Sequence, residues 1–298
     1  FIEQYCVYDS TDLSEDFDTL ATELHDGAAQ GSLTLSLSPD EHGRLALGVT
    51  RDMGDLGTVG IGLVSLGLSG IDADRDVVPK FVLDAGTFVP NDNEKSDAYD
   101  YRDMALGVSW SRSVSDRLDL GVTGKMVRQS IDGESATAWA ADFGAIYRID
   151  YNNTRIGARI NNLGSDLTFY DIASPLPLIF SVGASMDVFE TDGTKVTVLA
   201  DATKPQDAEQ LVFSGVEVSL FDMLHVRTGY KLNYQGVENE KVDETTGAIF
   251  DAPTTEEGLS FGVGADVPVP GLDATVDYAY TDFGILDSVH RISVSLQF

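Results

Sequence analysis

The chain has 298 residues, of which 49 are acidic and 19 basic, and its net charge at neutral pH is −30. This charge repels phosphate groups and argues against nucleic acid as a partner. No stretch approaches 18 uninterrupted apolar residues, so the sequence predicts no membrane-spanning helix. A membrane-spanning β-barrel remains open, because its strands are apolar only at alternate positions. With a single cysteine, Cys6, the chain forms no internal disulfide.

Residues 1–30 have a different pattern from the rest of the chain. The segment "TDLSEDFDTLATELHDG" places Phe17, Leu20 and Leu24 at helical spacing after a possible cap at Ser14. The spacing predicts one short amphipathic helix. We therefore divide the chain into an N-terminal segment, residues 1–30, and a second unit, residues 31–298.

From Gly31 onward the hydrophobic period is two, which is the period of β-strands. The pattern predicts strands at 31–38, 44–51, 58–69, 104–114, 118–130, 137–149, 154–163, 178–188, 194–203, 210–220, 224–234, 258–267, 272–281 and 289–298. In "AWAADFGAIYRI" the apolar row runs from Trp139 through Phe143 to Ile149, and the opposite row contains Asp142 and Arg148.

The two faces of these strands differ in a way that indicates which face is inside. The polar face carries charges in mid-strand, too many for a dry soluble core, while the apolar face carries Tyr and Trp near strand ends, as lipid-facing barrels do. Seven charged residues are candidates for lining the lumen: Asp142, Arg148, Arg159, Arg227, Lys231, Asp273 and Asp277. Two roles are open for them, a conducting pathway or a paired ladder that braces the wall.

The lengths of the connections predict the orientation. With Phe298 at the periplasmic end, the even-numbered connections are short: 52–57, 115–117, 150–153, 221–223 and 268–271. The long ones, 70–103, 164–177 and 235–257, all lie on the other side. Short periplasmic turns and long outer loops are typical of bacterial outer-membrane barrels. Parity also places Lys80–Val89 as a hairpin arm inside the first long loop, which leaves fourteen strands, an even number.

The final strand contains an apolar row, Ile292, Val294, Leu296 and Phe298. In a closed barrel the last strand pairs with the first, so this strand is predicted to be a seam. The row also resembles the signal that the barrel assembly machinery of the outer membrane reads.

Catalytic and metal-binding motifs are sparse. The four histidines are scattered over different elements, and no nucleophile elbow or phosphate loop is present. We therefore expect no enzymatic activity and no cofactor. Asp72, Asp74 and Asp76 alternate as in calcium loops, but the glycine and distal glutamate of an EF-hand are missing, so they form only a weak metal candidate beside the favoured interpretation, a solvated acidic loop.

Four segments carry a resemblance to a known family. Residues 54–76, 124–148, 160–167 and 277–298 resemble the PorV/PorQ family, outer-membrane barrels related to the FadL long-chain fatty-acid transporters. The resemblance implies a fourteen-stranded antiparallel transmembrane barrel. Members usually begin with a Gly-rich segment leading to Asn-Pro-Ala-Gly that forms a plug. Residues 1–30 contain neither feature, so they are at most a remnant of a plug.

Three functions follow from this resemblance, all in the bacterial outer membrane and in contact with its lipid. The first is a protein-docking component of a type IX-like secretion system, whose outer loops receive secreted proteins or other surface components. Apolar residues of the second long loop (Leu167, Phe169, Tyr170 and Ile172) favour docking, which needs exposed apolar surface. The alternative is FadL-like transport of small hydrophobic molecules, which needs a lined internal pocket. The third is a structural barrel of a surface assembly.

Overall fold

The structure is a computed structural model that describes residues 31–38, 44–71, 98–207, 210–232, 240–242, 249–251, 258–269, 272–282 and 288–297. Several predictions lie outside these ranges: the N-terminal helix in residues 1–30, the segment Lys80–Val89, the acidic candidates Asp72, Asp74 and Asp76, and the terminal Phe298. No helix among the described residues is long and apolar enough to cross a membrane.

The described residues are almost entirely β-strand, which confirms the predicted all-β antiparallel fold. The long strands are β1 (Gly31–Ser38), β2 (Arg44–Asp52), β3 (Thr58–Ile71), β4 (Tyr99–Ser115), β5 (Leu118–Ile131), β6 (Glu134–Ile149), β7 (Thr154–Gly164), β10 (Ile179–Thr191), β11 (Thr194–Pro205), β12 (Leu211–Leu220), β13 (Leu224–Leu232), β16 (Leu259–Val269), β17 (Leu272–Asp282) and β18 (Ser288–Gln297). Each overlaps a range predicted from the hydrophobic period. The short strands are β8 (Leu167–Phe169), β9 (Ile172–Ser174), β14 (Glu240–Val242) and β15 (Ile249–Asp251), and one 3-10 turn, η1, covers Gly54–Leu56.

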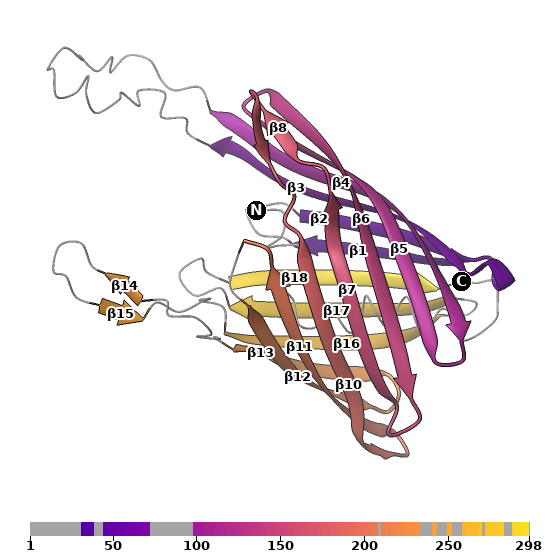
Figure 1. The fold of residues 1–298 in the computed structure, drawn as a ribbon. Coiled ribbons are helices and arrows are strands. Elements are labelled where there is room, and N and C mark those ends of the chain that lie inside the picture. The colour runs from indigo at the N-terminus through magenta and orange to yellow at the C-terminus, as the bar shows by residue number, and fades with distance from the viewer. Residues whose placement is uncertain are drawn as a thin grey trace, which may run out of the picture.

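Within the described residues the long strands number fourteen and form a closed antiparallel barrel, in the order β1-β18-β17-β16-β13-β12-β11-β10-β7-β6-β5-β4-β3-β2 (Figure 1). The closing contact joins β18 to β1, where Val294 lies opposite Leu35. On its other edge β18 pairs with β17, and Val294 lies opposite Val276. Two separate hairpins, β8–β9 and β14–β15, lie within the long connections.

The alternation along β6 shows how the sequence sets the two faces of the wall. Trp139, Phe143 and Tyr147 are 66%, 47% and 45% exposed, whereas the intervening Ala138 and Ile146 are buried. Successive side chains of a strand point to opposite faces, so one face of the wall carries large exposed apolar side chains and the other is covered.

Two strands begin earlier than the sequence predicted. The prediction started β4 at residue 104 and β6 at residue 137, whereas they start at Tyr99 and Glu134. The residues 99–103, "YDYRD", alternate tyrosine with charged residues and contain no aliphatic side chain, so the sequence prediction left them outside the strand. They form strand because the backbone ladder continues, with Tyr101 opposite Ile131 on β5.

Short turns gather at one end of the barrel and the long connections at the other (Figure 1). The turn before β3 shows how closely a short turn packs. Gly57 has φ +87°, and a Cβ atom there would lie 2.2 Å from the backbone oxygen of Ser111. Only glycine adopts this backbone so close to the neighbouring strand. The indole of Trp110 donates to the carbonyl of Leu56 at 2.8 Å and fixes the turn from outside.

Candidate functional site

The covered face of the wall carries charged side chains that bind one another across strands. Arg227 on β13 is the centre of the largest group: its Nε donates to Glu217 Oε2 at 2.7 Å and its Nη1 to Asp277 Oδ1 at 2.6 Å. The side chain of Arg227 is only 13% exposed. One guanidinium therefore joins three strands, because Glu217 belongs to β12 and Asp277 to β17.

The same group continues towards the short turns through His225. Its Nδ1 lies 3.0 Å from the hydroxyl of Ser219, and its Nε2 lies 3.1 Å from Asp266 Oδ2. The hydroxyl of Thr275 donates to the other oxygen of Asp266 at 2.8 Å. Charges and hydroxyls thus form a continuous network from β12 to β17.

A second group of charges joins β5 to β6. Lys125 Nζ lies 2.8 Å from Asp142 Oδ1, and the same carboxylate oxygen accepts the backbone N–H of Asn162 at 2.8 Å. Arg148 forms an ion pair with Asp119, which is 5% exposed at its side chain. The candidates Asp142, Arg148, Arg227 and Asp277 therefore all make cross-strand contacts, which is the geometry of the paired ladder that the sequence left open.

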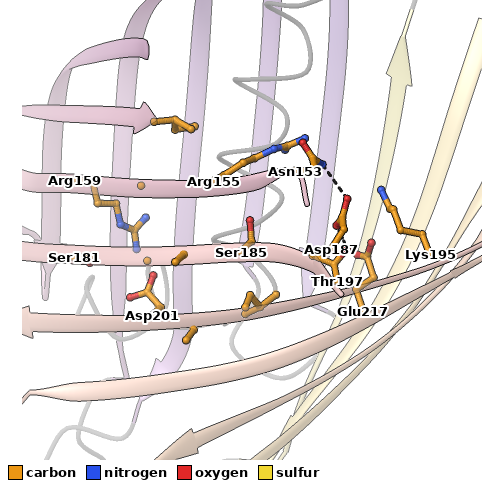
Figure 2. A pocket seen from close by; sticks show the side chains of 16 residues that line it. Asn153, Arg155, Arg159, Ser181, Ser185, Asp187, Lys195, Thr197, Asp201 and Glu217 are labelled. Carbon is orange, nitrogen blue, oxygen red and sulfur yellow. Dashed lines mark hydrogen bonds between the residues drawn. The ribbon is translucent and has the colours of Figure 1, made fainter. Parts of the chain in front are cut away.

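A pocket lies against the inner wall between these two groups, lined mainly by β7, β10 and β11, with Glu217 from β12 (Figure 2). Asp187 accepts from the amide of Asn153 at 3.0 Å and from the hydroxyl of Thr197 at 2.7 Å. At the left of Figure 2, Arg159 and Asp201 point toward each other. Gly183 leaves room for this arrangement, because a Cβ atom there would lie 2.9 Å from Asp201 Oδ2.

The lining of the pocket is mixed in charge and also contains apolar side chains such as Ile146 and Leu199. Three cationic side chains and three carboxylates belong to it: Arg155, Arg159, Lys195, Asp187, Asp201 and Glu217. Among the described residues, no group of three or more histidine, cysteine or acidic side chains is arranged to hold a metal ion. The pocket therefore offers polar contacts to a small molecule.

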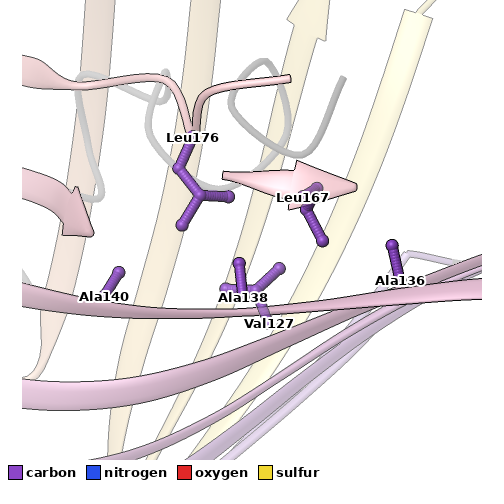
Figure 3. Packing of buried hydrophobic residues seen from close by; sticks show 6 residues of the cluster. All are labelled: Val127, Ala136, Ala138, Ala140, Leu167 and Leu176. Atoms are coloured by element: carbon purple, nitrogen blue, oxygen red, sulfur yellow. The ribbon is translucent and has the colours of Figure 1, made fainter. Parts of the chain in front are cut away.

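Nearer the long connections the inner wall becomes apolar. Val127 on β5 and the alanines of β6 lie beneath Leu167 and Leu176 (Figure 3). The buried members of this cluster, called the alanine patch from here on, are Val127, Ala136, Ala138, Ala140, Leu167 and Leu176. Small residues on β6 let the β8–β9 connection pack closely on the wall. A second, smaller cluster contains Ile179 and Phe213, and Lys231 Nζ lies 5.2 Å from the centre of the Phe213 ring.

The remaining predicted residues occupy different environments. Lys231 is 6% exposed beside Phe213, whereas Asp273 is exposed at the start of β17. In the expected assembly signal, Ile292 is 44% exposed and Val294 and Leu296 are half-buried on one row of β18.

The sequence analysis missed several charges of the inner wall, above all Glu217, Asp187 and Asp201. Strand parity contained the signal for one of them: in "VFSGVEVSL", Glu217 shares a row with the buried Phe213 and Ser219. A charge on the covered row predicts a partner on the neighbouring strand.

No family model and no curated protein matches the chain. Solved structures do share its fold. The toluene transporter TodX of Pseudomonas putida is 11% identical with a TM-score of 0.55, over 95% of this chain and 92% of that one. The monoaromatic hydrocarbon channel CymD is 11% identical, TM-score 0.51, over 95% and 91%. The toluene transporter TbuX of Ralstonia pickettii is 11% identical, TM-score 0.51, over 92% and 89%. These likenesses show the fold, and they give no support to the PorV/PorQ assignment.

Proposed function

We propose that this chain is a fourteen-stranded barrel of the bacterial outer membrane that passes small hydrophobic molecules. This replaces the docking role that the sequence analysis placed first. The proteins that share the fold are named as transporters and channels for toluene and monoaromatic hydrocarbons. They therefore favour the transport alternative, and none of the three is named as an enzyme.

The observation that carries the membrane part of the proposal is the apolar outer row. On β6 it begins at Trp139 and reaches Tyr147 eight residues later, both widely exposed. Eight residues of strand span about 27 Å, which after tilting suits a hydrocarbon band of about 25 Å flanked by aromatic girdles. On β10, Phe180 and Phe189 are 49% and 52% exposed, and strand pairing through Ile160 of β7 places Phe180 level with Phe143 of β6. An exposed apolar band around the whole barrel would be far larger than the apolar patches that soluble proteins carry, so the band indicates contact with lipid.

The transport part rests on the division of the inner wall. The alanine patch is covered by Leu167 and Leu176, so a hydrophobic molecule that arrives from the long-loop end gains its apolar contacts only by displacing the β8–β9 connection. Beyond the patch it meets the pocket, where Asp187 is bound to Asn153 and Thr197 and where Ile146, Leu199 and Ala200 add apolar contacts. A wall of paired charges binds such a molecule weakly, so the molecule can leave the patch and move on.

The transport proposal is tested by uptake. The chain is placed in the outer membrane of a bacterial host that lacks hydrocarbon channels of its own, and uptake of radiolabelled toluene at low concentration is measured. Leu176→Asp puts a charge into the alanine patch and should reduce uptake severalfold. Tyr170→Asp, on the same connection but 76% exposed, should leave uptake unchanged. Uptake no faster than that of the host with an empty vector, from a barrel with heat-modifiable migration on a gel, would refute transport.

The membrane part has its own test on β18. Val294 belongs to the outer row and Ser293 to the opposite one. A lipid-facing arginine costs about 2–4 kcal/mol near the midplane. Val294→Arg should therefore reduce the heat-modifiable fraction in the outer membrane much more than Ser293→Arg. Equal tolerance of the two variants would contradict a lipid-facing outer row.

One observation keeps docking as a second candidate. Tyr170 and Ile172 are 76% and 70% exposed at the tip of the β8–β9 hairpin, which lies at the long-loop end. If docking is the role, the double variant Tyr170→Asp with Ile172→Asp abolishes co-purification of secreted proteins from the native membrane, and toluene uptake is no faster than in the control host.

A further inference from the structure

The outer face of β4, β5 and β6 changes character over three successive rows of side chains. The rows, each read across the three strands, are Leu106–Met126–Trp139, then Met104–Arg128–Thr137, then Arg102–Ser130–Ser135. The first row is apolar and Trp139 is 66% exposed. The next two rows contain two arginines and three hydroxyl groups, and no carboxylate belongs to them. The apolar band therefore ends here against a set of hydrogen-bond donors.

The two arginines are placed to act on one ligand. Arg102 and Arg128 are both exposed, and they are diagonal neighbours because Arg128 lies two positions from Ser130, the partner of Arg102. Diagonal neighbours of a sheet lie about 7–8 Å apart, within reach of a single group for side chains as long as arginine. Arg128 Nη2 lies 3.2 Å from the hydroxyl of Ser135, so a hydroxyl stands beside the guanidinium.

Like charges placed side by side repel each other unless an anion lies between them. The chain as a whole does not favour anions, since its net charge is −30, and acidic residues follow directly beyond the third row. Asp132 and Glu134, in and just after the β5–β6 turn, are both exposed. The arginines thus form a narrow basic level between an apolar level and an acidic one, which is the depth at which lipid phosphates lie around a membrane-spanning barrel.

We infer that Arg102 and Arg128 bind the phosphate group of an anionic lipid in the membrane leaflet at the long-loop end. Guanidinium groups bind phosphate oxygens through paired hydrogen bonds, and hydroxyls such as Ser135 supply further donors. The acyl chains of that lipid would lie along Leu106, Met126 and Trp139. This inference rests on the proposed function, because it requires the outer row to face lipid.

The position of Trp139 allows a direct test. The chain has two tryptophans, so Trp110→Phe leaves Trp139 as the only indole, one row below the arginines. The purified barrel in mixed micelles is titrated with phosphatidic acid or phosphatidylcholine that carry the same brominated acyl chains, and quenching of Trp139 fluorescence is measured. Each basic residue near a membrane surface contributes about a fivefold preference for an anionic lipid. We expect phosphatidic acid to be preferred at least fivefold, and Arg102→Gln with Arg128→Gln to remove the preference.

The control variant is Arg112→Gln, an exposed arginine on the same outer row of β4 but towards the short turns, and it should keep the preference. Inorganic phosphate at millimolar concentration should not displace brominated phosphatidic acid. Displacement would show a soluble-anion site and overturn the lipid assignment, as would equal quenching by the two lipids. No quenching by either lipid would instead contradict the membrane-spanning proposal itself.

Discussion

Near the long loops the inner wall over β5 and β6 presents alanine and valine beneath two leucines, whereas near the short turns it presents side chains of opposite charge bound to one another. The change occurs within single strands. On β5, Val127 belongs to the alanine patch and Lys125, the next residue on the same face, binds Asp142. On β12, Phe213 is 2% exposed in an apolar cluster, while Glu217 on the same face binds Arg227.

This difference shows that one closed sheet can carry two internal environments without a change of backbone. In the apolar half a loop packs against small side chains and covers them. The charged half fixes its polar groups across strands, so the wall is braced there. A new carboxylate should therefore destabilise the apolar half much more than the charged half.

The largest expected effect comes from a carboxylate placed in the apolar half. Ala138 is fully buried beneath the β8–β9 connection, and Lys125 on the adjoining strand is already bound to Asp142. Ala138→Asp should destabilise the barrel by about 3–5 kcal/mol, the penalty of an uncompensated buried charge. The measurement is the midpoint of denaturant unfolding in lipid vesicles.

The matched variant is Ser185→Asp in the charged half, opposite Arg155 on β7. A new cross-strand pair of opposite charge changes stability by no more than about 1 kcal/mol. If both variants lower the midpoint equally, the division of the inner wall into two environments is wrong.

A smaller effect is expected from a single methyl group in the charged half. A Cβ atom on Gly264 would lie 2.2 Å from Asp277 Oδ1, so that carboxylate must leave its contact with Arg227. Gly264→Ala should cost about 1–3 kcal/mol, as overpacking does. At Gly262, on the same strand, the nearest atoms to such a Cβ lie 3.5 Å away, so Gly262→Ala serves as the control with an unchanged or slightly higher midpoint. An unchanged midpoint for Gly264→Ala would show that the network tolerates rearrangement.

The fold was predictable from the sequence because a barrel wall has two faces. The alternation of apolar and polar residues along each strand shows which residues belong to each face. Strand β6 shows this: Trp139, Phe143 and Tyr147 are the apolar row of the sequence and the exposed row of the structure. What the period could not reveal are the polar extensions of β4 and β6, where the strand continues through backbone pairing alone.

The sequence revealed individual charges of the site on single strands, but not which charges on different strands bind each other. Asp142 and Arg227 stand out as charges in mid-strand, but their partners depend on strand order and register, which a single sequence does not contain. The alanine patch could not be predicted from the sequence for the same reason. The alanines of β6 contact Leu176 only because the second long connection folds back on the wall.

The smallest expected effect concerns an exposed ion pair between two short turns of the barrel. Arg117 and Asp150 pair between two short turns, with side chains 54% and 71% exposed. A hydrogen bond with Tyr147 and the charge of Asp150 hold the pKa of Arg117 above its usual value, so it stays charged at any working pH. Exposed pairs contribute little because water and salt screen them. Arg117→Gln should leave the unfolding midpoint unchanged at physiological salt.

Arg148→Gln deprives the buried Asp119 of its cation and should lower the unfolding midpoint clearly. Equal shifts for the two arginines would mean that burial on the inner wall does not set the strength of its ion pairs, and the bracing role of the charged half would fail with it.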